Sequence, residues 1–154
     1  MKIIVASDSH GNQSLVDELF QKEVFDCFIF CGDGERDFSD HYGDARLEIV
    51  GGNCDWFSQF EDEMTLALKG KRIFITHGHK YFVKSSLAKL VKRAKDVNAD
   101  FVFYGHTHRQ SVEKIDGIYF INPGALKNGQ YVLIELQQDG NPVIEQKKIY
   151  EGER

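Results

Sequence analysis

The sequence contains no apolar run long enough to cross a membrane, which argues against a transmembrane protein. Proline occurs only twice in 154 residues, while 42% of the residues are hydrophobic, so the chain is not predicted to be disordered. Basic residues are outnumbered, 19 against 24 acidic ones, and the net charge is -5. Because no long-range positive field surrounds such a chain, we expect neither nucleic acid nor a membrane as its partner.

Cysteine is also scarce, and the three cysteines cannot all form disulfides with one another. Cys27 and Cys31 lie in a hydrophobic run, where thiols usually pack as small apolar groups. The chain reaches Asp8 and His10 after a short apolar stretch, which is not the pattern of a signal peptide. We therefore expect a cytoplasmic protein, and the length predicts a single domain over residues 1–154.

Short, continuous apolar runs predict buried strands at residues 3–6, 27–31 and 47–50. Between the first two, residues 12–23 have helical spacing behind a possible Asn12 cap, so those two strands are predicted to be parallel. A second amphipathic helix is predicted at residues 83–97. Further strands are predicted within residues 64–76, where two join around 69–71, and at residues 101–104, 111–115, 118–121, 131–136 and 143–149.

These elements predict an α/β fold in which two mixed β-sheets pack as a sandwich flanked by helices. The first half of the chain has the strand–helix–strand order of a parallel sheet, whereas the second half is rich in hairpins. We therefore expect parallel pairing in the first half and antiparallel pairing in the second.

Polar side chains gather where the predicted strands end. Because open α/β sheets bind ligands at the carboxyl ends of their strands, these positions are candidates for one site. Three of the groups are spaced i, i+2, which on extended backbone directs both side chains to one face. Adjacent glycines allow the loops to approach closely. The candidates are Asp8, His10, Asp33, Asn53, Asp55, His77, His79, His106 and His108.

A cavity that collects carboxylates, an amide and imidazoles is costly when empty, and a cation is its natural partner. Oxygen and nitrogen donors without thiolates suit catalytic manganese, iron, zinc, cobalt or nickel rather than a structural zinc. There are more ligands than one ion needs, so two ions are expected. Two neighbouring metals activate water for attack on phosphorus, which makes phosphoester hydrolysis the leading hypothesis.

The ordered motifs around these residues resemble those of the calcineurin-like metallophosphoesterases, in particular their small bacterial YfcE-like branch. They extend from Asp8 to Gly124 and so cover most of the chain. The series is highly specific as a set, although each motif alone is weak. The motifs occupy residues 8–10, 32–34, 51–55, 76–79, 105–108 and 122–125.

The resemblance implies two divalent metal ions bridged by Asp33. Manganese is the expected metal, with iron, zinc, nickel, cobalt or magnesium as alternatives. A hydroxide shared by the ions would attack phosphorus in a phosphodiester, or a phosphomonoester, of a small soluble substrate. Catalytic roles are assigned to Asp33, Asn53, Asp55 and His77. One ion would be held by Asp8, His10, Asp33 and His108, and the other by Asp33, Asn53, His77 and His106.

One position departs from the family pattern. Many relatives carry a histidine directly after the motif asparagine, where it is thought to assist the leaving group, but this chain has Cys54. A thiol is a poor proton donor to an alkoxide, so aryl esters are expected to react faster than alkyl esters. Asp55 could compensate in part by orienting His77 or a water molecule.

Several readings remain open from the sequence. His79 could support a ligand or be an ordinary loop histidine, and Asn12 is favoured as a helix cap over a phosphate contact. Three aromatic residues at 56, 57 and 60 could line the substrate cleft or form a partner surface, although completing a core is the commoner role. As a whole, the chain could also be a catalytically weak scaffold, like the small phosphoesterase-like subunit of the retromer coat. Pairing of exposed strands could give a homo-oligomer.

Overall fold

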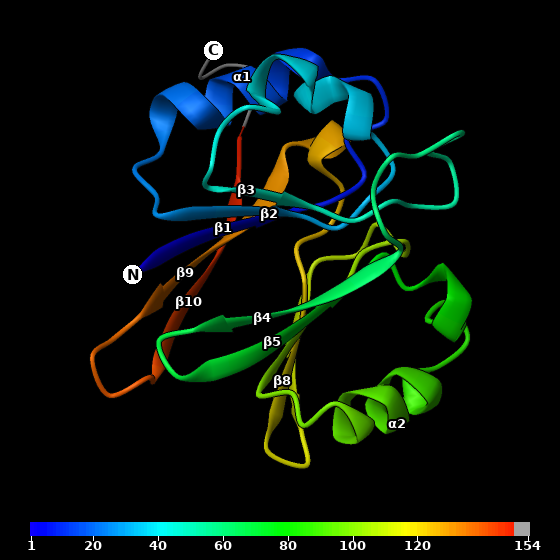
Figure 1. Ribbon diagram of the computed structural model, residues 1–154, viewed down its shortest axis with the longest axis vertical. Coiled ribbons are helices and arrows are strands. Elements are labelled where there is room, and N and C mark those ends of the chain that lie inside the picture. The colour runs from blue at the N-terminus through cyan, green and yellow to red at the C-terminus, as the bar shows by residue number, and fades with distance from the viewer. Residues whose placement is uncertain (150–154) are drawn as a thin grey trace.

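Two five-stranded β-sheets form the body of the protein in the computed structural model, which describes residues 1–149 (Figure 1). The first sheet has the order β10-β9-β1-β2-β3, and the second has the order β4-β5-β6-β8-β7. The strands of the first sheet are β1 (Lys2–Ala6), β2 (Cys27–Phe30), β3 (Leu47–Ile49), β9 (Gln130–Leu136) and β10 (Pro142–Lys148). Those of the second are β4 (Glu63–Leu68), β5 (Lys71–Thr76), β6 (Phe101–Phe103), β7 (Ser111–Ile115) and β8 (Ile118–Asn122).

The predicted fold class, two packed mixed sheets flanked by helices, is confirmed. Helix α1 (Gln13–Lys22) covers the outer face of the first sheet, and α2 (Ala88–Asp96) covers that of the second (Figure 1). Three short 3-10 helices complete the chain: η1 (Glu35–His41), η2 (His79–Tyr81) and η3 (Leu126–Asn128). Within the described residues no helix is both long and apolar enough to cross a bilayer. The last five residues of the domain expected over 1–154 lie outside the description.

The central strands β1, β2 and β6 are buried on both faces, which explains why they have continuous apolar runs rather than alternating ones. Ile3 and Val5 of β1 face the second sheet and pack in one cluster with Ile73 of β5. Ile4 of β1 faces the other way and packs with Leu19 of α1. The order of layers is therefore helix, sheet, sheet, helix.

The division of the chain into a parallel half and an antiparallel half was wrong. Strands β5, β6 and β8 lie parallel in the second sheet, and the hairpin of β9 and β10 joins the first sheet. Strand β9 pairs antiparallel with β1, so that Ile134 lies opposite Ile3. The local sequence pattern identified each strand. Which strands pair with each other is decided by long-range packing.

The structure confirms the predicted cap of α1 but places the start of α2 later than predicted. Asn12 caps α1 as expected, since its side chain accepts a hydrogen bond from the Leu15 N–H at 3.3 Å. Helix α2 begins at Ala88, five residues after the predicted start at position 83. Phe82 has a left-handed backbone conformation with φ 54°, and the chain passes through turns before the helix begins. The 3-10 helix at Glu35–His41 was not predicted.

Candidate metal centre

The predicted ligands lie on loops that follow the strands at one end of both sheets. Asp8 and His10 follow β1, Asp33 follows β2, His77 follows β5, and His106 follows β6. Left-handed backbone conformations, which side chains other than glycine rarely adopt, occur at several of them. Such strain persists only where the surrounding structure imposes it, and it is frequent at functional sites. The values of φ are 57° at Asp8, 42° at His10, 64° at Asp33, 73° at His106 and 61° at His108.

Two glycines let these loops approach each other closely. A Cβ atom on Gly52 would lie 2.2 Å from Asp33 Oδ1, and a Cβ on Gly105 would lie 2.6 Å from Asp8 Oδ2. Both distances are far shorter than van der Waals contact, so no larger residue fits at either position without moving a predicted ligand.

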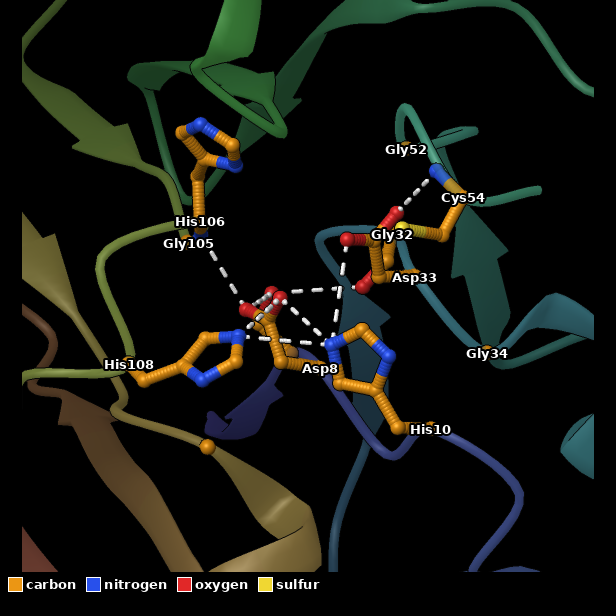
Figure 2. Close-up of polar contacts among 12 residues, drawn as sticks. Asp8, His10, Gly32, Asp33, Gly34, Gly52, Cys54, Gly105, His106 and His108 are labelled. Carbon is orange, nitrogen blue, oxygen red and sulfur yellow. Dashed lines mark hydrogen bonds and ion pairs between the residues drawn. The ribbon is translucent and has the colours of Figure 1, made fainter. Parts of the chain in front are cut away.

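A first group of ligand atoms comes from Asp8, His10 and His108 (Figure 2). His108 Nε2 lies 3.2 Å from Asp8 Oδ1, and His10 Nε2 lies 3.4 Å from the same oxygen. The two imidazole nitrogens are 3.3 Å apart. Separations of this size are expected between donors that share one ion with metal–ligand bonds of about 2.0–2.2 Å.

A second group comes from Asp33, His77 and His106. His77 Nε2 lies 3.1 Å from Asp33 Oδ2, and the same carboxylate oxygen lies 3.8 Å from His10 Nε2 of the first group. Asp33 therefore lies between the two groups, in the position that the bridging role requires. Its other oxygen, Oδ1, accepts a hydrogen bond from the Cys54 N–H at 2.7 Å.

Two buried polar atoms at the centre have no hydrogen-bond partner in the described structure, Asp8 Oδ1 and His77 Nε2. Each of these side chains is held in place by hydrogen bonds to its second oxygen or nitrogen atom. Asp8 Oδ2 accepts hydrogen bonds from Ser7 Oγ at 2.6 Å and from the His106 N–H at 3.1 Å. His77 Nδ1 lies 2.8 Å from the Cys31 carbonyl oxygen, to which it can only donate, so its Nε2 lone pair faces the cluster. Buried polar atoms without partners are rare and costly, and a bound cation would satisfy both.

The buried acidic and basic groups at the centre shift one another's pKa values. Burial opposes ionisation of Asp33, but His77 and the Cys54 N–H outweigh it and hold the pKa of Asp33 well below its usual range. Burial opposes protonation of His77, but Asp33 and Asp8 outweigh it and raise the pKa of His77. Burial, with repulsion from His77 and Lys84, lowers the pKa of His106 to about 4. His106 is therefore a neutral imidazole near pH 7, as a metal ligand must be.

Asn53 lies on the loop after β3, next to Gly52. Its side chain is exposed, and its Nδ2 lies 3.6 Å from Cys54 Sγ. Within residues 1–149 the structure records no contact between the Asn53 side chain and the other six predicted ligands. The placement of the loop is consistent with the assigned ligand role, which stays a prediction.

Asp55 anchors the loop that carries Asp33. Its two carboxylate oxygens accept four backbone hydrogen bonds, from Asp33, Gly34, Glu35 and Gly52, at 2.8, 2.8, 3.1 and 2.8 Å. The predicted role for Asp55 was to orient His77 or a water molecule. In the structure its carboxylate instead joins the loops after β2 and β3, and His77 is oriented by a backbone carbonyl.

Other supporting residues had no clear signal in the sequence. Asp37 Oδ2 accepts hydrogen bonds from Ser9 Oγ at 2.6 Å and from the Gly11 N–H at 2.9 Å, which holds the loop that carries His10. Asn122 Nδ2 donates to the Gly105 carbonyl at 3.2 Å and to Thr107 Oγ1 at 2.9 Å. Ser7, described above, likewise holds the Asp8 carboxylate through a hydrogen bond. The sequence motif at 122–125 included Asn122, but only the structure shows that it fixes the loop of His106 and His108.

Two further histidines lie at different distances from the centre. The His79 ring centroid is 5.4 Å from that of His77, and its Nδ1 is buried without a hydrogen-bond partner in the described chain. Burial and His77 lower the pKa of His79. His79 belongs to neither ligand group, so its two predicted roles both remain open. His41 stacks on Phe20, and its Nε2 lies 2.8 Å from Asp17 Oδ1; it belongs to none of the ligand groups.

The loop after β3 also carries the residue that departs from the family pattern. Cys54 Sγ lies in a third group of potential ligand atoms, with His10 and Asp33, so the thiol faces the centre. Burial and the carboxylates, Asp33 foremost, raise its pKa. All three cysteines of the chain are free.

Comparison with known proteins identifies the family. Residues 1–139 match the model of the calcineurin-like phosphoesterase superfamily domain. The chain belongs to this superfamily. It is 30% identical over 151 residues to the probable metallophosphoesterase YsnB of Bacillus subtilis, which covers 93% of this chain and 89% of YsnB. It is also 30% identical over 144 residues to the phosphodiesterase MJ0936 of Methanocaldococcus jannaschii, which covers 80% of this chain and 83% of that protein.

Solved structures agree with this assignment to the superfamily. A predicted phosphoesterase of Streptococcus pneumoniae superimposes with a TM-score of 0.75 at 26% identity, over 95% of this chain and 97% of that one. Vps29 of Entamoeba histolytica, solved with zinc, superimposes with a TM-score of 0.76 at 20% identity, over 96% and 99% of the two chains, and shares the fold. The resemblance expected from the motifs is confirmed, including the small branch that contains YsnB and MJ0936.

Proposed function

We propose that the protein hydrolyses phosphodiesters of a small soluble molecule with the help of two divalent metal ions, manganese being the expected metal. Phosphomonoesters are a second class of substrate to test. The observation that carries the proposal is the pair of partnerless buried atoms, Asp8 Oδ1 and His77 Nε2, at the meeting point of two His/Asp groups. Similarity to the phosphodiesterase MJ0936 supports the reaction class.

The donor set fits the two expected ions. Asp8, His10 and His108 would hold one of them, His77 and His106 the other, and Asp33 both, with Asn53 completing the second. When bound, the ions would supply Lewis-acid chemistry, which would lower the pKa of water and neutralise charge on the phosphoryl oxygens of the ester.

The chain's own residues prepare the site for this chemistry. Ser7 and the His106 N–H orient the Asp8 carboxylate, the Cys31 carbonyl fixes the tautomer of His77, and Asp55 holds the Asp33 loop. The site contains two buried carboxylates, so two divalent ions leave it positively charged even in an acidic protein. A phosphate ester would bind there through that local charge.

Hydrolysis of bis(p-nitrophenyl) phosphate by the metal-loaded protein tests the proposal. We expect turnover with Mn²⁺, loss of turnover with a chelator, and recovery when metal is added back. Elemental analysis of the loaded protein should find close to two ions per chain. Turnover that persists in chelator would contradict the metal mechanism.

The alternative is a scaffold without catalysis, the interpretation suggested by the retromer-type relatives. Complete preservation of the seven predicted ligands favours the enzyme. A protein that binds metal stoichiometrically but hydrolyses neither aryl diesters nor aryl monoesters would favour the scaffold instead.

The position of Cys54 predicts a strong dependence on the leaving group. The thiol faces the centre, but burial and Asp33 raise its pKa, which makes it a still weaker proton donor. Since general acid catalysis contributes about 10²–10⁴-fold, a p-nitrophenyl diester should react at least about 10²-fold faster than a dialkyl diester at saturating metal. Cys54→His should narrow this ratio by accelerating the alkyl ester. Equal rates for the two esters in the unchanged protein would contradict the argument.

A further inference from the structure

A pocket of about 290 Å³ opens directly beside the metal centre. It is lined in part by His10, Asp33 and Cys54, whose ligand atoms form one of the three groups described above. Arg36 and Trp56 line it as well. The volume is at the lower end of the range of about 300–1,000 Å³ for small-molecule sites, which suits a group of the size of one ring system.

The acidic residues that line this pocket are already engaged within the protein. Glu35 Oε2 accepts a hydrogen bond from Ser58 Oγ at 2.6 Å, and Asp37 Oδ2 accepts one from Ser9 Oγ at 2.6 Å. Asp55 accepts the four backbone hydrogen bonds already described. Apart from the candidate metal ligands and Cys54, the large side chains that line the pocket and can meet a ligand are the indole of Trp56 and the guanidinium of Arg36.

For Trp56 the sequence left open a place in the substrate cleft, a partner surface or the core; the core was favoured, and the structure does not place Trp56 there. Its exposed fraction is 75%, and that of Phe57 is 97%. Phe60, the third aromatic residue of the segment, does pack against the core beneath η1. Asp55, the residue before Trp56, is bound to the loop that follows β2. Trp56 therefore borders the pocket, whereas Phe60 reaches the core.

Arg36 reinforces this rim. Its Nη2 donates to the Trp56 carbonyl oxygen at 3.5 Å, and it forms no ion pair with a carboxylate in the part of the chain that the structure describes. An exposed indole and an unpaired guanidinium are the two side chains that most often stack on planar rings. Both line the same pocket as His10 and Asp33, which would hold metal beside the scissile phosphate.

We propose that this pocket binds a planar ring of the substrate against Trp56, so that the substrate is a nucleotide ester rather than an ester of an aliphatic alcohol. The proposal rests on the proposed function and adds to it the chemical class of one ester group. Nucleosides are the common biological alcohols that carry a planar ring, and base stacking tolerates any nucleobase because each has a π face.

The chain offers a direct probe, because Trp56 is its only tryptophan. The zinc-loaded protein is titrated with adenosine 5'-monophosphate or ribose 5-phosphate, which share the sugar phosphate and differ in the base. Zinc is chosen because this closed-shell ion has no redox chemistry. Indole fluorescence, excited where adenine does not absorb, should be quenched saturably by the nucleotide and not by the sugar phosphate.

Competitive inhibition of bis(p-nitrophenyl) phosphate hydrolysis gives the second measurement. Trp56→Ala should raise the inhibition constant of the nucleotide by roughly 5- to 150-fold, which is the effect of losing one stacked base, and leave that of ribose 5-phosphate unchanged. Trp56→Phe should restore most of the affinity. Phe57→Ala is the matched control, since Phe57 is adjacent and exposed but does not line the pocket.

The experiments distinguish failure of the proposed function from failure of ring binding at Trp56. Absence of metal-dependent hydrolysis would overturn the proposed function, whereas the fluorescence titration can still be made. If hydrolysis occurs but the nucleotide and the sugar phosphate bind equally, or if Trp56→Ala affects both alike, stacking on Trp56 is overturned and the metal mechanism stands.

Discussion

Asp33→Asn is expected to abolish metal-dependent hydrolysis, lowering kcat/KM by about a hundred-fold or more. Loss of a group that merely supports a ligand usually costs about 10- to 100-fold, and Asp33 is in direct reach of both ligand groups. Its Oδ2 lies 3.1 Å from His77 Nε2 and 3.8 Å from His10 Nε2. An amide has nearly the same shape but no negative charge and only one acceptor oxygen, so it cannot bridge two cations.

Metal content is the measurement that separates this effect from misfolding. We expect Asn at position 33 to reduce the bound metal from about two ions toward one or none, while the far-ultraviolet circular dichroism stays unchanged. Asp40→Asn is the matched control, because Asp40 is exposed on η1 and contacts Gln13 at 3.0 Å. Wild-type metal content together with wild-type kcat/KM in Asp33→Asn would rule out the bridging role.

Asp55→Ala is expected to have the largest effect on stability and also to weaken metal binding. Four backbone N–H groups, at Asp33, Gly34, Glu35 and Gly52, would lose a charged acceptor together. Each hydrogen bond to a charged group contributes about 1.5–3 kcal/mol. Because Asp55 is only partly buried, water can replace some of them, so we expect a loss of about 3 kcal/mol in the free energy of unfolding.

Denaturant unfolding in the presence of chelator measures this loss without the contribution of bound metal. With metal present, affinity and kcat/KM should each fall by about 10- to 100-fold, the usual effect of removing a group that positions a ligand. Asp55→Asn keeps one acceptor oxygen and should lie between the wild type and Asp55→Ala. An unchanged unfolding free energy in Asp55→Ala would show that the loop is held by other contacts.

The fold and the site differ in how far local sequence specifies them. Residues 3–6 and 27–31 are recognisable as strands because continuous β-branched and aromatic residues can be buried on both faces. Asn12 is recognisable as a cap because its partner, the Leu15 N–H, is three residues away. The start of α2 was misplaced by five residues because residues 83–87 share the amphipathic spacing of the helix but form turns after the left-handed Phe82.

The ligand set was accessible from the sequence because each ligand follows a strand directly. A residue that follows a strand in a parallel sheet must lie at one end of that sheet, wherever the neighbouring strands come from. His10 and His108 follow strands of different sheets, and it is the packing of the two sheets that brings their Nε2 atoms to 3.3 Å although 98 residues separate them. The groups that hold the ligands were not accessible, because a serine or a backbone carbonyl carries no distinguishing signal until its partner is known.

The sequence by itself determined the order of the strands and the two α-helices, the family, and the set of candidate metal ligands, because each depends on local periodicity or on motifs at strand ends. The tertiary structure alone decided that β9 pairs with β1, that Asp55 joins the loops after β2 and β3, and that Trp56 borders a pocket instead of entering the core. These features depend on which distant segments pack together. That choice is made by the burial of whole sheet faces and by hydrogen bonds between loops far apart in the chain, which no short stretch of sequence encodes.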